Sequence, residues 1–359
     1  MNNWMTRLND DFNKLVSEID KAPEIIKMPT PSLNWALGNG GFVEGKLAVM
    51  YGPESGGKSL LGILTLIEIQ KKYPEGFCLL FDAEYSFNKE WFIKLGGDPD
   101  RLIVRQTNDP VQIFDYWYGE LLEHLQDGLP LKGIMLDSVR SIVYPKDMKD
   151  VSTKMVQGGT GAAYLPNVLK RIVPIIREYG ILTLFIQQVS EELDMFKKIN
   201  NPFVIPDGRA LKHNADYFIE VTKIETKEGK VVSGKNMIGA NQQIGHKVRM
   251  KIKKNRTRAP YRPAQFTLIY EKGISNISEE IYNLAKSLGI IFHPKGESNQ
   301  MWKFADYDSI RGEAKMKQWV EDNPKIQEEI MEACNNATDS QIQSIINETS
   351  GGISIDTED

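Results

Sequence analysis

Cysteine is nearly absent from this chain of 359 residues, which contains only Cys78 and Cys334. Two cysteines without metal-ligand spacing exclude a disulfide framework and a cysteine-based zinc site, and they are typical of a protein from a reducing, cytoplasmic compartment. Long hydrophobic runs are also missing, since no stretch approaches the roughly 18 apolar residues of a membrane span. The first residues, MNNWMTRLNDDF, lack the apolar core of a signal peptide. We therefore expect a soluble cytoplasmic protein with no membrane partner.

Positive charge is not in excess either, because 44 lysines and arginines face 48 aspartates and glutamates, for a net charge of −4. Such a chain is not a polycation, so any surface for nucleic acid must be local and offset by acid elsewhere. Apolar residues make up 41% of the composition. Over this length, that is enough for one large core with smaller appended units.

Short apolar runs alternate with helical patterns through the centre of the chain. The runs expected to be buried strands are KLAVMY, FCLLF, GIMLD and ILTLFI, and helical patterns such as LLGILTLIEIQKK and NVLKRIVPIIREYG separate them. This alternation predicts an α/β fold with a twisted, mostly parallel sheet. Three later runs, YFIEVTKIE, GHKVRMKIKK and QFTLIYE, are expected to extend the sheet with antiparallel strands.

The two ends of the chain differ from this centre. Apolar residues fall on one helical face between Trp4 and Ile19, before a linker with prolines at 23, 29 and 31. That helix either covers its own domain or docks on another subunit. The last 80 or so residues form a smaller α+β unit, with an apparent centre at Trp302, Phe304, Trp319 and Val320.

These patterns divide the chain into four parts. We expect an N-terminal oligomerisation helix and linker in 1–32, an α/β core in 33–276, a small domain in 277–335 and an acidic tail in 336–359. After Lys325 the chain has eight acidic residues and no basic one, and its last residues, GGISIDTED, are predicted to be disordered. The tail either competes with nucleic acid for any basic surface or simply solubilises the end.

One segment has the pattern G-x-x-x-x-G-K-[ST] of a phosphate-binding loop, between an apolar strand and a helix, which is the context that the motif requires. Small residues let successive backbone N–H groups turn toward an anion, and the helix N-terminus adds its partial positive charge. Lys58 is expected to reach the β- and γ-phosphates, and the Ser59 hydroxyl to bind Mg²⁺. The segment consists of Gly52, Pro53, Glu54, Ser55, Gly56, Gly57, Lys58 and Ser59.

Polar residues close three of the apolar runs, where the carboxyl ends of wound strands meet a bound ligand. Asp137 is the candidate partner of Ser59 in binding Mg²⁺. Glu84 is a candidate to orient and deprotonate the water that attacks the γ-phosphate, and Gln188 is a candidate sensor of that phosphate. Glutamates and glutamines are common at strand ends. From spacing alone, Glu84 and Gln188 could therefore also be ordinary surface residues without a role in catalysis.

Several segments resemble, in the right order, the motifs of RecA-type homologous-recombination proteins. They lie between about residues 30 and 325 and include TPSLNWALGNGGFVEGKLAVMYGPESGGKS, FDAEYSFNKEWFIKLGGDP, LDSVRSIV, FIQQ, GRALKHNAD and KIKKNRTRAPYRPAQF. The C-terminal GEAKMKQWVEDNP is similar to the small terminal domain of the bacterial members. The resemblance implies a RecA-type P-loop ATPase core.

The resemblance also implies roles for single residues. Glu84 matches the family's catalytic glutamate, and Gln188 matches the glutamine that couples nucleotide to the DNA-binding loop. Trp91 stands where the family has an adenine-stacking tyrosine and Asn88 where it has an aspartate near the base, and Tyr270 is a further candidate near the base.

Lys254 and Arg256 match two lysines that the family presents to the neighbouring subunit's ATP, where cations stabilise the charge of the transferred phosphate. Charge alone would favour a DNA-facing or solvated basic strand for this pair. Because Trp91 and Arg256 depart from the usual bacterial pattern, the chain could be either a bacterial or a phage-encoded member of the family.

Two long stretches without a clear period match the family's DNA-binding loops, from about Asp150 to Gly161 and from Ser190 to Arg209. Lysines and an arginine would meet phosphates, and apolar side chains would wedge between bases, which predicts binding to single-stranded DNA of any sequence. An acidic start, at Glu191, Glu192 and Asp194, departs from the family pattern. The candidates for DNA binding are Lys154, Lys170, Met195, Phe196, Lys197, Lys198, Gly208 and Arg209.

The resemblance therefore implies an ATP- and Mg²⁺-dependent DNA strand-exchange recombinase that hydrolyses ATP and forms helical filaments. Its implied partners are single-stranded DNA, homologous duplex DNA and further copies of itself, with mediator and single-stranded-DNA-binding proteins as possible additions. The alternatives are a ring-shaped helicase with the same core or another ATPase that depends on single-stranded DNA. The basic strand GHKVRMKIKKNRTRAP, joined to a tryptophan-bearing C-terminal unit, favours the recombinase.

Overall fold

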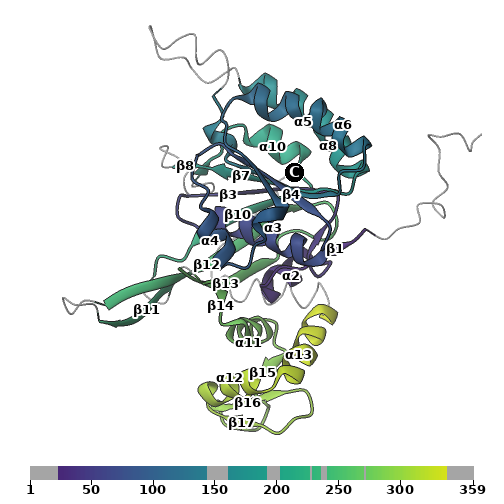
Figure 1. The fold of residues 1–359 in the computed structure, drawn as a ribbon. Helices are drawn as coiled ribbons and strands as arrows, with labels where there is room; N and C mark the ends of the chain where they lie inside the picture. The colour runs from purple at the N-terminus through teal and green to yellow at the C-terminus, as the bar shows by residue number, and fades with distance from the viewer. Residues whose placement is uncertain are drawn as a thin grey trace, which may run out of the picture.

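A large twisted sheet forms the centre of the molecule in the computed structural model (Figure 1), which describes residues 23–143, 161–191, 203–226, 229–235, 241–270 and 272–337. The sheet has ten strands, of which β11 (Lys230–Lys235) pairs only with β12. The others, in spatial order, are β14 (Gly273–Ser275), β13 (Pro263–Ile269), β12 (Asn241–Asn255), β10 (Tyr217–Lys223), β3 (Leu47–Gly52), β7 (Leu182–Gln188), β6 (Leu131–Asp137), β4 (Phe77–Asp82) and β5 (Leu102–Arg105).

The predicted α/β fold with a mostly parallel sheet is confirmed. The four apolar runs expected to be buried strands form β3, β4, β6 and β7, which lie side by side and parallel. One expectation needs correction: β10 is antiparallel to β12 but parallel to β3, so it continues the parallel part of the sheet. The antiparallel extension therefore begins one strand later than expected, at β12.

Both faces of the sheet are covered, and the alternation of side chains along β3 shows why. Ala48 and Met50 belong to one apolar cluster, while Leu47, Val49 and Tyr51 belong to the other. A strand that is buried on both faces has no polar alternation, as its sequence indicated.

Different helices cover the two faces (Figure 1). The first face carries α3 (Lys58–Lys72) and α2 (Pro31–Leu37), with α4 (Lys89–Lys94) near the edge. The second face carries α5 (Tyr116–Tyr118), α6 (Glu120–Gln126), α8 (Gly161–Glu178) and α10 (Gly208–Asn214).

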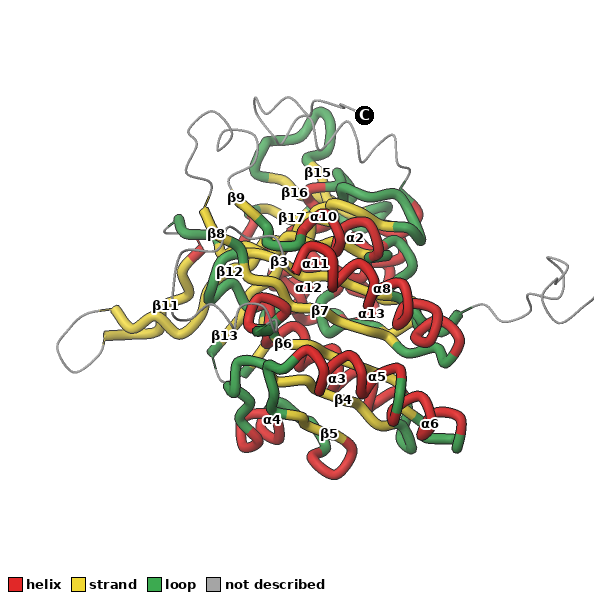
Figure 2. Tube along the Cα trace, turned by 90° about the horizontal axis from the view of Figure 1, so that it is seen from above, coloured by secondary structure: helices red, strands yellow, loops and turns green. Residues whose placement is uncertain are grey.

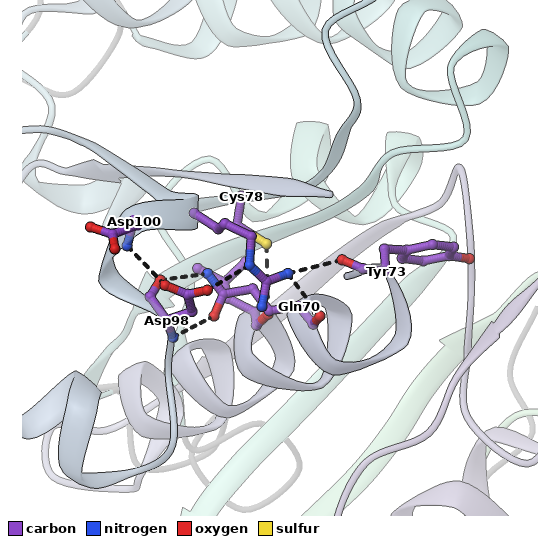
Figure 3. Close-up of polar contacts among 7 residues, drawn as sticks. Gln70, Tyr73, Cys78, Asp98 and Asp100 are labelled. Atoms are coloured by element: carbon purple, nitrogen blue, oxygen red, sulfur yellow. Dashed lines mark hydrogen bonds and ion pairs between the residues drawn. The ribbon is translucent and has the colours of Figure 1, made fainter. Parts of the chain in front are cut away.

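Helix α3 is fixed at its C-terminal end by Arg101, the last residue of the short helical turn η2 (Pro99–Arg101). Its guanidinium donates 2.9 Å hydrogen bonds to the carbonyl oxygens of Gln70 and Tyr73, and it pairs with Asp98 at 2.7 Å. The Gln70 side chain and the Asp98 backbone exchange two more hydrogen bonds (Figure 3). Because the last carbonyls of a helix have no partner within it, this cation stabilises the end of α3.

The C-terminal unit packs against the core through α2. It consists of α11 (Ile277–Ser287), α12 (Glu313–Asp322) and α13 (Pro324–Asn336) with a small sheet of β15 (Ile291–Phe292), β16 (Met301–Phe304) and β17 (Ile310–Arg311). Of the four residues expected at its centre, Trp302, Phe304 and Val320 are buried, while Trp319 is only partly buried against the core.

Three hydrogen bonds hold this unit to α2. The buried carboxylate of Glu280, from α11, accepts from the Thr30 hydroxyl at 2.6 Å and from the Ser32 N–H at 2.7 Å. The Trp35 indole donates to the Cys334 carbonyl of α13 at 3.0 Å. Burial raises the pKa of Glu280 to about 7.

Strands β11 and β12 extend beyond the rest of the sheet as a two-stranded arm, visible in both orthogonal views (Figures 1 and 2). The sequence did not predict this arm, because the expected strand began only at Gly245 and no strand was expected at β11. The arm joins the core where β12 pairs with β13, from Gly245 opposite Ile269 onward.

Some expectations concern residues outside the described ranges. They include the N-terminal helix between Trp4 and Ile19, most of the acidic tail and most of both DNA-binding stretches. The expected linker contains a short strand, β1 (Ile25–Ile26), which pairs with β2 (Phe42–Val43). Across the part of the chain that the structure describes, no helix has the length and apolarity needed to cross a membrane.

Candidate functional site

The phosphate-loop motif lies between β3 and α3, at the carboxyl edge of the parallel strands. Gly57 precedes the helix with φ +91°, a conformation that favours glycine. At Gly52, a Cβ atom would lie 2.0 Å from the Val221 carbonyl oxygen, so only glycine fits against β10. The loop is therefore held by backbone approach on one side and by the helix start on the other.

Lys58 is buried at the start of α3, and its ammonium group donates a hydrogen bond back to the Pro53 carbonyl across the loop. Burial lowers the pKa of Lys58, and the nearby carboxylates of Asp137, Glu84 and Glu54 partly offset that effect. A cation in this position, next to a helix N-terminus, is suited to a polyphosphate.

The strand-end residues come together as the sequence predicted. Gly52 lies opposite Gln188 in the β3–β7 pair, and Asp82 lies opposite Asp137 in the β4–β6 pair. A pocket of about 650 Å³ opens at this edge of the sheet. It is lined by the loop residues from Glu54 to Ser59 together with Glu84, Asp137 and Gln188.

Asp137 has the environment of a cation ligand. Its side chain is buried, and within the described residues its Oδ1 atom has no hydrogen-bond partner. The pKa of Asp137 is raised to about 6 by burial and by the charges of Glu84 and Asp82, although a hydrogen bond from Ser59 opposes the shift. A divalent cation would remove this cost, because it would pair the carboxylate.

The pair of Ser59 and Asp137 fits Mg²⁺ bound together with a nucleotide. No group of three or more His, Cys, Asp or Glu residues that could hold a metal occurs in the described ranges. Mg²⁺ usually takes only one or two protein ligands and fills its octahedron with phosphate oxygens and water.

Glu84 lines the pocket and is held by three side chains. Its Oε1 atom accepts hydrogen bonds from the Gln188 amide at 2.7 Å, from the Ser138 hydroxyl at 2.6 Å and from the Ser141 hydroxyl at 3.3 Å. Sequence reasoning found Glu84 and Gln188 but missed both serines. The position of Ser138 directly after the strand-end Asp137 was the one available signal.

Asp82 positions the turn that carries Glu84. Its buried carboxylate accepts hydrogen bonds from the backbone N–H groups of Ser86 and Phe87, each at 3.0 Å, and from the Gln106 amide at 3.0 Å. A carboxylate that organises a turn in this way fixes the direction of the residues inside it. The sequence reading assigned no role to Asp82.

The pocket lining also includes aromatic side chains. Trp91 and Tyr270, the candidates near a base, both line it. The Asn88 side chain caps α4 by accepting a 2.9 Å hydrogen bond from the Trp91 N–H, and Asn88 borders a smaller adjoining pocket with Trp91 and Ser59. His246 also lines the main pocket, and the sequence reading did not select it.

Lys254 and Arg256 are absent from the lining of this pocket. Both cations donate to the backbone carbonyl of His213 at the C-terminal end of α10, at 3.0 Å and 2.8 Å, and Lys254 also donates to the Lys212 carbonyl. Burial and the charge of Arg256 lower the pKa of Lys254. The pair is thus separate from its own chain's phosphate loop.

Three of the DNA-binding candidates are described. Lys170 is exposed on α8, while Gly208 and Arg209 are the first two residues of α10. A Cβ atom at Gly208 would lie 2.8 Å from the Ile205 side chain, so glycine is needed there for packing. Lys154, Met195, Phe196, Lys197 and Lys198 lie outside the described residues.

Comparisons with known proteins agree with this geometry. The family model described as RecA N-terminal domain matches residues 9–275. Protein RecA of Bifidobacterium longum is 28% identical over 318 residues, which is 88% of this chain and 74% of the relative. Protein RecA of Mesomycoplasma hyopneumoniae (strain J) is 29% identical over 307 residues, 86% of this chain and 84% of the relative. Protein RecA of Aquifex pyrophilus is 28% identical over 314 residues, which is 86% of this chain and 82% of the relative.

Proposed function

The chain belongs to the RecA family, and from this premise we propose that it is an ATP-dependent recombinase that exchanges DNA strands within filaments on single-stranded DNA. The observation that carries the proposal is the hydrogen bond between Glu84 and Gln188 in the lining of the phosphate-loop pocket. It joins a candidate base for hydrolysis to the strand that leads into a candidate DNA-binding stretch.

In the proposed site, backbone N–H groups of the loop and the Lys58 ammonium bind the phosphates of ATP. Ser59 and Asp137 hold Mg²⁺, which neutralises charge on the β- and γ-phosphates. The three hydrogen bonds to Glu84 all end on Oε1. We assign Oε2 to the water that attacks the γ-phosphate.

Gln188 is positioned to respond to a bound nucleotide. Its amide donates to Glu84 at 2.7 Å. A γ-phosphate within reach would compete for that donor, because hydrogen bonds to charged oxygens are the stronger ones. Gln188 would then turn at the start of the segment that follows β7, where β8 (Ser190–Glu191) pairs with β9 (Phe203–Val204). We propose this turn as the link between ATP and DNA.

Lys254 and Arg256 would complete the site of a neighbouring copy. Their position away from their own chain's pocket supports action across an interface. Two cations there would stabilise the charge of the transferred phosphoryl group. The proposed assembly is therefore a head-to-tail filament in which every ATP lies between two subunits.

We propose further that 1–32 binds the adjacent subunit, that 33–276 is the ATPase core, that 277–335 is a small domain and that 336–359 is a tail. Because β1 pairs with β2, a truncation that tests the N-terminal part should remove residues 1–22 and spare β1. Normal filaments from that truncated chain in electron micrographs would contradict the docking role.

The experiment that tests the function measures ATP hydrolysis with and without single-stranded DNA, together with strand exchange between a circular single strand and a linear duplex. We expect DNA to stimulate hydrolysis and exchange to need ATP and Mg²⁺. The comparisons favour this function over a ring-shaped helicase. Unwinding of a forked duplex, without strand exchange, would support the helicase instead.

A further inference from the structure

His246 has an unusual position in the pocket. It lies on β12 directly opposite Leu268 of β13, and its side chain is only 3% exposed although it lines the pocket. Directly opposite residues in an antiparallel pair share one face of the sheet. His246 therefore faces the same side as Leu268, whose methyl group approaches the start of α3 at Gly57.

A chain of hydrogen bonds favours one position for the proton on its ring. The Gln243 amide nitrogen lies 3.0 Å from the Gly245 carbonyl oxygen and 3.1 Å from the Tyr270 hydroxyl. Because a carbonyl oxygen can only accept, the nitrogen of the Gln243 amide, and not its oxygen, must face Gly245. The two hydrogens on this nitrogen then make one hydrogen bond to Gly245 and one to Tyr270. The Tyr270 oxygen accepts one of them, which leaves its own hydrogen available for the Nδ1 atom of His246 at 3.3 Å.

This arrangement favours one tautomer. If Nδ1 accepts from Tyr270, the single proton of the neutral imidazole must be on Nε2. Burial and the charge of Lys223 lower the pKa of His246, which keeps the ring neutral at neutral pH. Within the described residues the Nε2 atom is buried and has no partner. Such a donor costs stability unless a ligand supplies an acceptor.

We propose that His246 donates this Nε2–H hydrogen bond to an acceptor on the nucleoside half of the bound nucleotide, and so helps to determine nucleotide specificity. The inference rests on the proposed ATP site. The loop and Lys58 already supply the hydrogen-bond donors for the phosphates. His246 instead lines the pocket together with the aromatic side chains of Tyr270 and Trp91. Aromatic faces with one fixed donor are suited to a base and its ribose.

Two substitutions test the donor. We expect His246→Leu to weaken the affinity for a non-hydrolysable ATP analogue about three- to tenfold, which is the effect of one neutral hydrogen bond. His246→Gln keeps an N–H donor near the Nε2 position and should stay close to wild type. Equal affinities of the wild type and the Leu variant, with matching thermal unfolding curves, would overturn the proposal.

Nucleotide analogues identify the acceptor and use the unaltered protein. The 2′-deoxy and 3′-deoxy forms of ATP each lack one ribose hydroxyl, a carbocyclic form lacks the ribose ring oxygen, and 1-deaza, 3-deaza and 7-deaza forms each lack one ring nitrogen. The analogue that lacks the acceptor should bind the wild type about three- to tenfold more weakly than ATP does. Its affinity should not fall further when His246 is replaced by leucine. If each analogue loses the same affinity with both proteins, His246 contacts no nucleoside acceptor and the proposal fails.

The tautomer can be observed directly in the full-length chain. The chain has four histidines, so a spectrum of ¹⁵N-histidine-labelled protein compared with that of His246→Gln assigns the ring of His246. We expect a protonated Nε2 and an unprotonated Nδ1, and a mixture of tautomers after Tyr270→Phe. A ring protonated on Nδ1 in the unaltered chain would overturn the proposal.

A Lys58→Ala control separates this inference from the function it rests on. Nucleotide binding that depends on Lys58 but not on His246 rejects the inference and leaves the ATP site in place. A wild-type chain that binds no adenine nucleotide at all contradicts both.

Discussion

The Gln188 amide donates a 2.7 Å hydrogen bond to the Glu84 carboxylate, although the two residues are 104 positions apart in the sequence. Gln188 ends β7 and Glu84 follows β4, with β6 lying between these two strands. The bond therefore spans the carboxyl edge of three neighbouring strands. It places the candidate base and the candidate sensor in one contact.

The first prediction concerns the base. Glu84→Gln keeps the side chain's size but removes its capacity to accept a proton. We expect the rate of ATP hydrolysis with single-stranded DNA to fall by about 10²- to 10⁴-fold, as for the loss of a general base. ATP affinity should change little, because the phosphates are held by the loop. Steady-state phosphate release and equilibrium binding give the two values.

Ser141→Ala is the matched control for this substitution. It removes the longest of the three contacts to Glu84, at 3.3 Å, and should lower the rate by less than about tenfold. If Glu84→Gln hydrolysed ATP at the wild-type rate, Glu84 would not be the general base.

The second prediction concerns the interface. Lys58→Ala and Lys254→Ala should each abolish hydrolysis when assayed alone. Mixed before filament assembly, they should recover part of the activity, because some interfaces then join an intact loop to an intact Lys254. The measurement is ATP hydrolysis as a function of the mixing ratio, with the highest rate near equal amounts. No recovery at any ratio would place Lys254 in the site of its own chain.

The third prediction follows from the raised pKa of Glu280, which is about 7 in the folded chain against an ordinary value of 4.5. The folded state holds a proton that the unfolded state has released between these values, so the free energy of unfolding falls as the pH rises from about 4.5 to 7. Above pH 7 the full cost is present, at most about 3 kcal/mol.

Urea unfolding of the wild type and of Glu280→Gln at pH 5, 6, 7 and 8 measures this effect. The glutamine keeps the acceptor for Thr30 and Ser32 but does not titrate. The variant should gain up to about 3 kcal/mol relative to the wild type between pH 5 and pH 8. A difference that stays constant over this range would show that Glu280 does not titrate there.

The fourth prediction concerns the end of α3. Arg101→Met keeps most of the apolar stem but removes the donors to Gln70 and Tyr73. We expect a loss of about 2 kcal/mol in the free energy of unfolding, typical of hydrogen bonds from a charged group. The exposed pair of Lys71 and Glu68 supplies the control, since Lys71→Met should change stability by less than about 0.5 kcal/mol. Equal effects of the two substitutions would contradict the capping role.

The parallel sheet could be predicted from the sequence because strands buried on both faces are continuous apolar runs. Asp137 and Glu84 could be found because parallel strands present their carboxyl ends at one edge. The serines that hold Glu84 had weaker signals, since serine is common in turns. His246 had none, because its role depends on a cross-strand register with Leu268 and on a hydrogen bond to Tyr270. Neither can be read from a local pattern.

The joint at α2 affects how the C-terminal unit can move. On one side the Ser32 hydroxyl exchanges hydrogen bonds with the backbone of Gln265 in β13, and on the other side Ser32 and Trp35 are bonded to α11 and α13. The strand β13 runs on toward Tyr270. A rotation of the C-terminal unit would therefore pull on β13 and, through it, on the side of the pocket that Tyr270 lines.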